Sequence, residues 1–323
     1  MFKPINILLT GGCGFIGSNF INYYKNEYPN IKIINYDKLD YCSNKENINH
    51  DNLIIDNINN KEKVLSILNE YNIDTIIHFA SQTHVDNSFG NSLTFTIDNI
   101  LGTHTLLECC RIYGKIKKFI HISTDEVYGE VDINHKGCLE KSLLNPTNPY
   151  AATKTSAEFI VKSYYYSFNI PIIITRSNNV YGKRQYPEKI IPKFISQIIN
   201  NKKCTIHGEG KTRRNFIYIN DLIKALIIIL HNGEINNIYN IGTDNEYSVL
   251  EIANKIIKYL KPNEKIDDWI EFTEDRIFND FRYKINNTEI KKLGWNEETN
   301  FDDGLKETIN WYLNNNIFKE ISL

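Results

Sequence analysis

The sequence has no excess of basic residues: 37 Lys and Arg are balanced by 39 Asp and Glu, which gives a formal net charge of −2. Nucleic acids and anionic membranes are drawn by a basic excess, so the composition offers no electrostatic case for either partner. The densest basic cluster, Lys211-Thr212-Arg213-Arg214, suits a single phosphate group better than a polymer.

Other absences exclude further classes of protein. The six cysteines form no C-x-x-C pair, and no histidines or cysteines stand at metal-ligand spacing, so we expect free thiols, no metal and a reducing compartment. No apolar run approaches the roughly 20 residues that cross a bilayer. No basic leader with a cleavage site precedes the first predicted strand. These features predict a cytoplasmic protein that does not bind membranes.

What is present is the pattern of a large α/β protein. The 323 residues, of which 41% are hydrophobic and 24% charged, are enough for one large unit or for two lobes that share a cleft. Short apolar strands alternate with helical patterns up to about residue 180. This alternation predicts a Rossmann-type doubly wound parallel sheet in a first domain, 1–180. Beyond it we expect a smaller C-terminal substrate-binding lobe, 181–323, with residues of about 216–242 returning to the first domain.

The predicted elements are stated by residue range. The strands are 5–10, 31–36, 53–55, 74–80, 118–122, 172–175, 204–207 and 216–218. The helices begin after the first strand and include 61–71, 92–113, 150–168, 221–230, 249–260 and 301–313.

A glycine-rich turn, Gly11-Gly12-Cys13-Gly14-Phe15-Ile16-Gly17, stands between a predicted strand and a predicted helix. Its glycines allow a tight turn and let a pyrophosphate reach the helix N-terminus, where free N–H groups and the dipole favour an anion. Asp37 ends the second strand, where a carboxylate takes ribose hydroxyls and repels a 2′-phosphate. The pattern favours NAD over NADP; a structural turn with a capping Asp is the alternative.

Two adjacent carboxylates, Asp125 and Glu126, follow Ser123-Thr124 at the end of the predicted strand 118–122. Ligands of open α/β sheets bind at the carboxyl ends of the strands. Neighbouring side chains there point in different directions, so the pair can meet different atoms of one ligand. In unlike environments, one carboxyl can act as an acid and the other as a base. A solvated Asp-Glu turn is the alternative for this stretch taken alone.

A third motif, Tyr150-Ala151-Ala152-Thr153-Lys154, follows Asn148-Pro149 and opens a predicted helix with Tyr150 and Lys154 on one face. An ammonium beside a phenol lowers the pKa of the phenol, which makes the phenolate a usable base at a hydroxyl carbon. Taken alone, the spacing is also that of an ordinary surface pair. The agreement of this motif with the glycine turn and with Ser123-Thr124 favours the catalytic interpretation.

Together these motifs resemble the extended short-chain dehydrogenase/reductase family. Within that family, Asp125-Glu126-Val127-Tyr128-Gly129 resembles the nucleotide-sugar 4,6-dehydratases, in which the Asp-Glu pair marks dehydration. The resemblance extends over essentially the whole chain, through Ala80-Ser81-Gln82-Thr83-His84-Val85-Asp86, Asn178-Asn179-Val180-Tyr181-Gly182 and Gly208-Glu209-Gly210-Lys211-Thr212-Arg213-Arg214. It implies a lyase that converts NDP-glucose to NDP-4-keto-6-deoxyglucose through an internal NAD redox cycle, with a tightly held cofactor.

The resemblance also implies roles for individual residues and a homodimer built on the helices 92–113 and 150–168. The catalytic residues would be Thr124, Asp125, Glu126, Tyr150 and Lys154. The cofactor-binding residues would be Gly11, Gly14, Phe15, Ile16, Gly17, Asp37, Lys38, Asp56, Ala80, Tyr150 and Lys154. The substrate-binding residues would be Ser81, His84, Thr124, Asn179, Lys189, Arg214, Arg276 and Asn279.

One stretch departs from the common bacterial dTDP-glucose pattern Asp-Arg-Pro-Gly-His-Asp. This chain has Asp275-Arg276-Ile277-Phe278-Asn279-Asp280, which looks more like the dehydratase part of plant-type UDP-rhamnose synthases. The resemblance therefore favours UDP-glucose over dTDP-glucose, although one methyl group on the base is worth only about 1 kcal/mol in a pocket. A rhamnose route would need a partner enzyme to finish it. The alternatives are a UDP-sugar 4-epimerase or decarboxylating relative, which does not need the Asp-Glu pair, and a non-catalytic NAD-sensing module.

Overall fold

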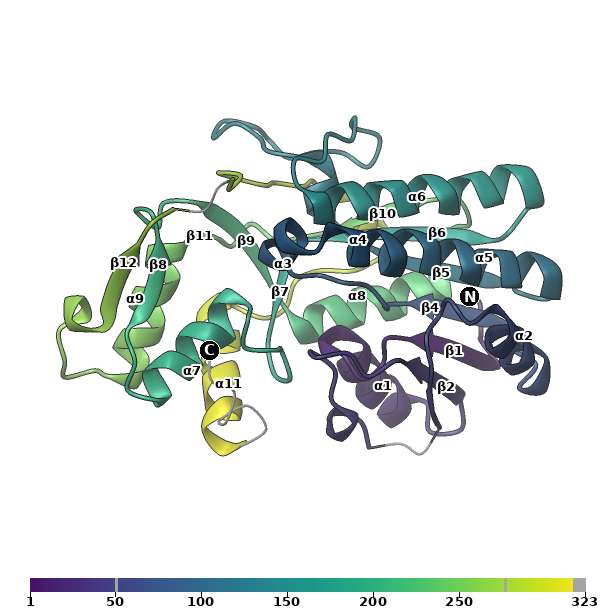
Figure 1. The fold of residues 1–323 in the computed structure, drawn as a ribbon, viewed down its shortest axis with the longest axis horizontal. Helices are drawn as coiled ribbons and strands as arrows, with labels where there is room; N and C mark the ends of the chain where they lie inside the picture. The colour runs from purple at the N-terminus through teal and green to yellow at the C-terminus, as the bar shows by residue number, and fades with distance from the viewer. Residues whose placement is uncertain (50–51, 276–277, 316–323) are drawn as a thin grey trace.

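A seven-stranded parallel sheet forms the centre of the computed structural model, which describes residues 1–49, 52–275 and 278–315 (Figure 1). The predicted Rossmann-type doubly wound fold is confirmed. The strands, in their order across the sheet, are β10 (Ile238–Ile241), β6 (Ile172–Ser177), β5 (Lys118–Thr124), β4 (Thr75–His78), β1 (Asn6–Thr10), β2 (Lys32–Asp37) and β3 (Leu53–Ile55).

Helices cover both faces of this sheet (Figure 1). On one face α1 (Phe15–Glu27) packs against α8 (Ile219–Asn232), and on the other α5 (Gly102–Tyr113) packs between α2 (Lys61–Glu70) and α6 (Pro149–Phe168). Because both faces are covered, the central strands are buried along nearly their whole length, which explains their continuous apolar runs.

The predicted helix 92–113 is interrupted by a different helical geometry. It consists of α4 (Ser92–Phe95), a π-helical stretch (Thr96–Leu101) and α5, and it follows the short helix α3 (Val85–Gly90). A π-helical turn often lies at a functional site because its wider turn re-aims side chains. Here it buries Asp98 and Asn99 towards the sheet.

The remaining elements form a smaller part of the molecule, at the left of Figure 1. A three-stranded sheet contains β11 (Glu246–Ser248), β9 (Arg213–Tyr218) and β7 (Asn179–Tyr181), and a two-stranded sheet pairs β12 (Ile270–Thr273) with β8 (Cys204–His207). The helices of this part are α7 (Ile190–Ile199), α9 (Val249–Leu260) and α11 (Phe301–Asn314), whereas α10 (Thr288–Lys292) packs against β10 of the central sheet. The sequence analysis did not predict α7. Pro192 lies in its first turn, where proline's missing N–H leaves no hydrogen bond unmade.

A buried ion pair ties α6 to β6. Arg176 and Glu158, whose side chains are 1% and 0% exposed, form a bidentate contact of 3.0 Å and 2.5 Å. Arg176 Nη1 also donates to the Tyr128 hydroxyl at 2.6 Å, and Tyr128 lies in the 3-10 helix (Asp125–Tyr128) that follows β5. The pair therefore joins three elements that meet at the carboxyl edge of the sheet.

Replacing Glu158 with Ala should lower the free energy of unfolding by about 3–5 kcal/mol, because it leaves the Arg176 guanidinium buried without its counter-ion. Urea unfolding followed by circular dichroism measures this. The matched control is Glu209→Ala, which removes an ion pair with Lys211 whose side chains are 74% and 73% exposed. The control should change stability by less than about 1 kcal/mol. Equal effects of the two substitutions would contradict the prediction.

Candidate active site

A cavity runs along the carboxyl edge of the central sheet, from the glycine-rich turn after β1 to the end of β5. All the residues predicted to bind the cofactor line it, namely Gly11, Gly14, Phe15, Ile16, Gly17, Asp37, Lys38, Asp56, Ala80, Tyr150 and Lys154. The structure thus brings together residues that lie up to 143 positions apart in the chain, as between Gly11 and Lys154.

The glycine-rich turn is shaped to receive an anionic group. Gly11 has a φ of +75°, and a Cβ on Gly17 would lie 2.4 Å from the Gly11 carbonyl oxygen, so the turn needs glycine at both positions. The following helix α1 has no side-chain cap at its N-cap Gly14 and no acidic residue in its first turn. Its first amides are therefore open to a phosphate.

Asp37 holds this turn in place from the end of β2. Its two carboxylate oxygens accept hydrogen bonds from the backbone N–H groups of Cys13 and Leu39, each at 2.8 Å. Burial raises the pKa of Asp37, and these hydrogen bonds oppose the rise. The oxygens retain lone pairs, since a carboxylate accepts about four hydrogen bonds.

A polar cluster that the sequence analysis missed lies beside Lys38 in the same cavity. Lys38 Nζ contacts Asp40 at 2.8 Å and Asp98 at 2.7 Å, and the Gln82 side-chain amide donates to both of these carboxylates. Asp98 comes from the π-helical stretch, 60 residues after Lys38. No local sequence pattern indicates that Asp98 lines the cavity, because its ion-pair partner Lys38 lies far away in the sequence.

Two contacts lie beside the cavity. The Tyr41 hydroxyl donates to Glu188 at 2.8 Å, and Lys189 Nζ donates to the Thr83 carbonyl oxygen at 2.7 Å. Each contact joins a loop of the central sheet to the segment before α7. Thr83, Glu188 and Lys189 also line the cavity.

Asp125 lies directly after β5 and is 3% exposed. The Asn178 side-chain amide donates to its Oδ2 at 2.8 Å, and the Thr124 hydroxyl lies 3.4 Å from its Oδ1. Burial raises the pKa of Asp125 to about 7, the charge of Glu126 adds to the rise, and the hydrogen bond from Asn178 opposes it. A carboxyl group with this pKa holds a proton at neutral pH much more often than an ordinary Asp.

Glu126 has different surroundings. The Asn148 side-chain amide donates to its Oε2 at 3.2 Å, and the residue lines both the first cavity and a second one beside it. Burial raises the pKa of Glu126, and the positive charges of Arg214 and Lys189 oppose the rise. The two neighbouring carboxylates therefore meet different partners.

Tyr150 and Lys154 lie on the buried face of α6, with 7% and 4% of their surface exposed. Asn148 caps this helix by accepting the Ala151 N–H at 2.8 Å, and Pro149 occupies its first position. Lys154 Nζ donates to the Ile122 carbonyl oxygen at 2.7 Å, and burial lowers the pKa of Lys154 to about 8.

The sequence predicted a lowered pKa for Tyr150, but in the protein without ligands this pKa is raised. Burial raises the pKa of Tyr150, and the charges of Glu126 and Asp125 raise it further. The ammonium group of Lys154 is engaged by a backbone carbonyl oxygen instead. The sequence predicted that the two residues share one helix face, but it did not predict the effect of the two carboxylates in the 3-10 helix after β5 on the phenol.

The second cavity holds most of the predicted substrate-binding residues. His84, Asn179, Lys189, Arg214 and Asn279 line it, whereas Ser81 and Thr124 line the first cavity. Arg276 lies outside the described residues. Arg214 Nη2 is 3.5 Å from Asn279 Oδ1, and the guanidinium lies 4.5 Å from the centre of the Tyr283 ring.

Two kinds of feature are absent from the described part of the chain. Within residues 1–49, 52–275 and 278–315, no three His, Cys, Asp or Glu residues are grouped as a metal site would require. In the same part of the chain, no helix combines the length and the apolar character of a membrane span.

The fold and the cavity define a Rossmann-type protein of the extended short-chain dehydrogenase/reductase class, with paired carboxylates at the end of β5. The chain belongs to the GDP-mannose 4,6 dehydratase family, whose model matches residues 8–308. The resemblance to nucleotide-sugar 4,6-dehydratases is thereby confirmed.

Three known proteins show how far the similarity extends. A trifunctional UDP-glucose 4,6-dehydratase/UDP-4-keto-6-deoxy-D-glucose 3,5-epimerase/UDP-4-keto-L-rhamnose-reductase of Arabidopsis thaliana is 49% identical over 97% of this chain and 48% of its own length. The dTDP-D-glucose 4,6-dehydratase of Dictyostelium discoideum is 47% identical over 96% and 82%. A dTDP-glucose 4,6-dehydratase structure from Streptomyces venezuelae with NAD bound has a TM-score of 0.91 and 31% identity, covering 98% and 99%. The chain thus spans about half the length of the plant relative.

Proposed function

We propose that this protein is an NAD-dependent lyase that removes water from an NDP-glucose to give NDP-4-keto-6-deoxyglucose. The observation that carries the proposal is the pair Asp125 and Glu126, held in unlike environments where the two cavities meet. An elimination needs an acid and a base on one sugar, and a simple dehydrogenase or an epimerase does not.

The residues of the first cavity fit NAD. The uncapped N-terminus of α1 would take the pyrophosphate, and the remaining lone pairs of Asp37 would take the adenosine ribose hydroxyls. Bound NAD supplies the hydride chemistry, by accepting a hydride from C4 of the sugar and returning one to C6. Lys38, Asp56 and Ala80 line the cavity beside Asp37 and would complete the binding site.

Each catalytic side chain has a proposed task. Tyr150, assisted by Lys154 and Thr124, takes the proton of the C4 hydroxyl. Once C4 is a ketone, Glu126 removes the acidified C5 proton, and Asp125 protonates the departing C6 hydroxyl. Glu126 later returns the proton to C5. The raised pKa of Asp125, about 7, suits a group that must start as an acid at neutral pH.

The substrate diphosphate would lie in the second cavity against Lys189, Arg214 and Asn279. We keep Arg276, which lies outside the described residues, as a further proposed contact. Ser81, His84 and Asn179 would contact the sugar and the phosphates. For the base we favour uracil over thymine, and the similarity to the plant relative supports this choice. We also propose that residues 1–180 bind the cofactor and that 181–323 bind the nucleotide sugar. We propose that a segment of about 216–242 returns to the first domain, and the packing of α8 against α1 and the pairing of β10 with β6 support this for the part of the segment after β9.

A paired incubation tests the function. Purified protein is given UDP-glucose and dTDP-glucose separately, and the 4-keto-6-deoxy product is followed by mass and by its alkaline ultraviolet absorbance. Turnover of either substrate supports the dehydratase, and the ratio of the two rates decides the base. If neither substrate loses water while the protein carries NAD, the proposal is wrong and the 4-epimerase alternative takes its place.

We further propose that the protein is cytoplasmic. All six cysteines are free thiols, which is the state that a reducing compartment maintains.

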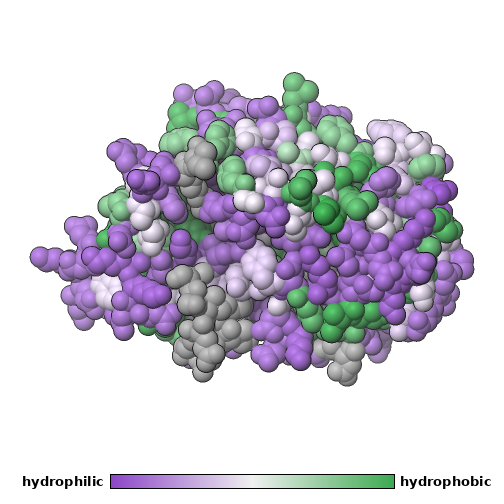
Figure 2. Space-filling view, in the orientation of Figure 1, coloured by the Kyte–Doolittle hydropathy of each residue, from purple (hydrophilic) through white to green (hydrophobic). Residues whose placement is uncertain are grey.

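We also propose that the protein is a homodimer. Hydrophobic residues gather on the face over α4 and α6 (Figure 2). Leu93, Ile97, Leu101 and Phe159 are 49–74% exposed there, and a gathering of exposed apolar side chains is typical of a protein–protein interface. Sedimentation should give twice the mass of the chain, and a monomer at micromolar concentration would contradict the proposal.

The pH dependence of turnover should be bell-shaped. Asp125 must be protonated to act as the acid, so kcat is lost as the pH rises through its pKa, which is about 7 in the protein alone. Glu126 must be ionised to act as the base, so kcat is lost as the pH falls through its own raised pKa. The two limbs belong to the coupled pair. Because Tyr150 must also be ionised to act at C4, the measurement is the rate of product formation relative to first-turnover cofactor reduction at each pH. A ratio that climbs steadily through the alkaline range would contradict the assignment of Asp125.

A further inference from the structure

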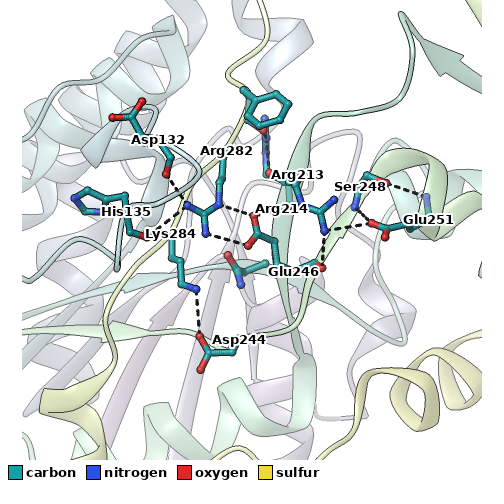
Figure 3. A network of polar contacts seen from close by, with 12 residues as sticks. Asp132, His135, Arg213, Arg214, Asp244, Glu246, Ser248, Glu251, Arg282 and Lys284 are labelled. Carbon is teal, nitrogen blue, oxygen red and sulfur yellow. Dashed lines mark hydrogen bonds and ion pairs between the residues drawn. The ribbon is translucent and has the colours of Figure 1, made fainter.

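A network of charged side chains holds residues 278–284, which lie between β12 and α10, to neighbouring elements (Figure 3). Arg282 is 3% exposed and forms a bidentate contact with Glu246 of β11, at 2.6 Å and 3.0 Å. Its Nη1 donates to the Asp132 carbonyl oxygen at 2.7 Å. Asp132 lies in the loop that follows the 3-10 helix of Asp125 and Glu126. The network thus fixes the 278–284 segment to both β11 and the catalytic loop.

The same segment also lines the second cavity, through Phe278, Asn279, Asp280 and Tyr283. Arg214 reaches it from β9, beside Asn279 and over the Tyr283 ring. The diphosphate of the proposed substrate would therefore bind against this segment.

Asp280 borders the same cavity but is only 3% exposed. Its Oδ2 accepts a hydrogen bond from the Thr147 hydroxyl at 2.7 Å and another from the Tyr283 hydroxyl. Its Oδ1 is buried and has no hydrogen-bond partner among the described residues. A buried carboxylate that is only half satisfied is costly, so its presence needs a reason other than stability.

Thr147 connects Asp280 to the proposed base. The next residue, Asn148, uses one side-chain amide in two ways: its Oδ1 caps α6 through the Ala151 N–H, and its Nδ2 donates to Glu126 Oε2. A shift of this turn would therefore displace the hydrogen bond that Asn148 donates to the base Glu126.

We propose that Asp280 is a positioning residue that transmits the placement of the 278–284 segment, through Thr147 and Asn148, to Glu126. The inference rests on the proposed function and deepens it. Asp280 touches neither the sugar nor the cofactor in this account. Asp280 holds the base Glu126 near the C5 proton when the 278–284 segment is correctly placed. The same segment lines the diphosphate subsite, so the placement of the base and of the diphosphate would be linked.

The test compares Asp280→Asn and Thr147→Val, singly and together, in the full-length protein. Two readouts separate the steps: reduced-cofactor absorbance in the first turnover reports C4 oxidation, and exchange of the C5 proton with deuterated water reports Glu126. We expect C5 exchange and kcat to fall by up to about 10²-fold, since misplacement by about 1 Å can cost that much. C4 oxidation and KM should stay close to the wild-type values.

Three comparisons make the result specific. The double variant should lose no more than either single variant, because both break one connection. Thr147→Ser keeps the hydroxyl and should restore C5 exchange. Asp244→Asn, which removes an exposed carboxylate 3.6 Å from Lys284 in the same region, should change nothing. Circular dichroism and NAD content check that each variant is folded.

Each other outcome overturns the role. Parallel loss of C4 oxidation and C5 exchange, additive losses in the double variant, or an unchanged C5 exchange would each remove Asp280 as a positioning residue. These outcomes are read in a preparation whose wild type turns over NDP-glucose. If the wild type turns over neither nucleotide sugar, the proposed function itself fails and this role with it.

Discussion

Glu126→Gln should stop water loss while leaving C4 oxidation measurable. The amide keeps the size of the side chain and can still meet the Asn148 amide through its oxygen, but it cannot take the C5 proton. General-base catalysis contributes about 10²–10⁴-fold, so product formation should fall by that factor. Because without elimination the hydride can return to C4 but cannot reach C6, reduced cofactor should be detectable on the protein in the first turnover.

The measurement is the absorbance of reduced nicotinamide after mixing with substrate, beside product mass at longer times. Glu209→Gln, at a 74% exposed side chain, is the control and should behave as the wild type does. Unchanged product formation in Glu126→Gln would remove Glu126 as the C5 base. Loss of both the absorbance and the product would show that Glu126 acts before C5, at C4 oxidation.

Tyr150→Phe should instead abolish the first step. Without the phenol oxygen the C4 hydroxyl has no base, so neither reduced cofactor nor product should appear, and kcat should fall by about 10²–10⁴-fold. Tyr150 is 7% exposed, and the change removes one hydroxyl group without opening a cavity the size of a side chain. The protein should therefore stay folded and keep its NAD.

The control for this variant is Tyr165→Phe on the same helix, which is partly exposed and lines neither cavity. Reduced cofactor formed by Tyr150→Phe at the wild-type rate would contradict the assignment of the C4 base. The two substitutions together separate oxidation from elimination: Glu126→Gln blocks after the first hydride transfer, and Tyr150→Phe blocks before it.

The features that the sequence predicted well are those with local causes. The glycine turn follows from backbone geometry between a strand and a helix, and α6 begins at Asn148-Pro149 because the cap and the proline specify a helix start. The placing of Asp125 and Glu126 at a strand end follows from the apolar run before them.

The features that could not be predicted from the sequence depend on contacts between residues that are distant in the chain. Asp98 is 60 residues from Lys38, and Asp280 is 133 residues from Thr147. The residues next to Asp98 and Asp280 in the sequence do not indicate which residue either of them contacts. The raised pKa of Tyr150 is of the same kind, because the carboxylates responsible come from another element. Sequence patterns predict which face a residue takes, and the fold decides which residue it meets.

The single cavity that would hold the whole dinucleotide, from the glycine-rich turn to Tyr150 and Lys154, has a consequence for metabolism. The proposed cycle returns every hydride within one turnover, so the dinucleotide does not need to leave this cavity. The nicotinamide would then be set to its oxidised form by the sugar chemistry itself, out of equilibrium with free NAD and NADH. Flux through the enzyme would follow the supply of nucleotide sugar and be insulated from the redox balance of the cell.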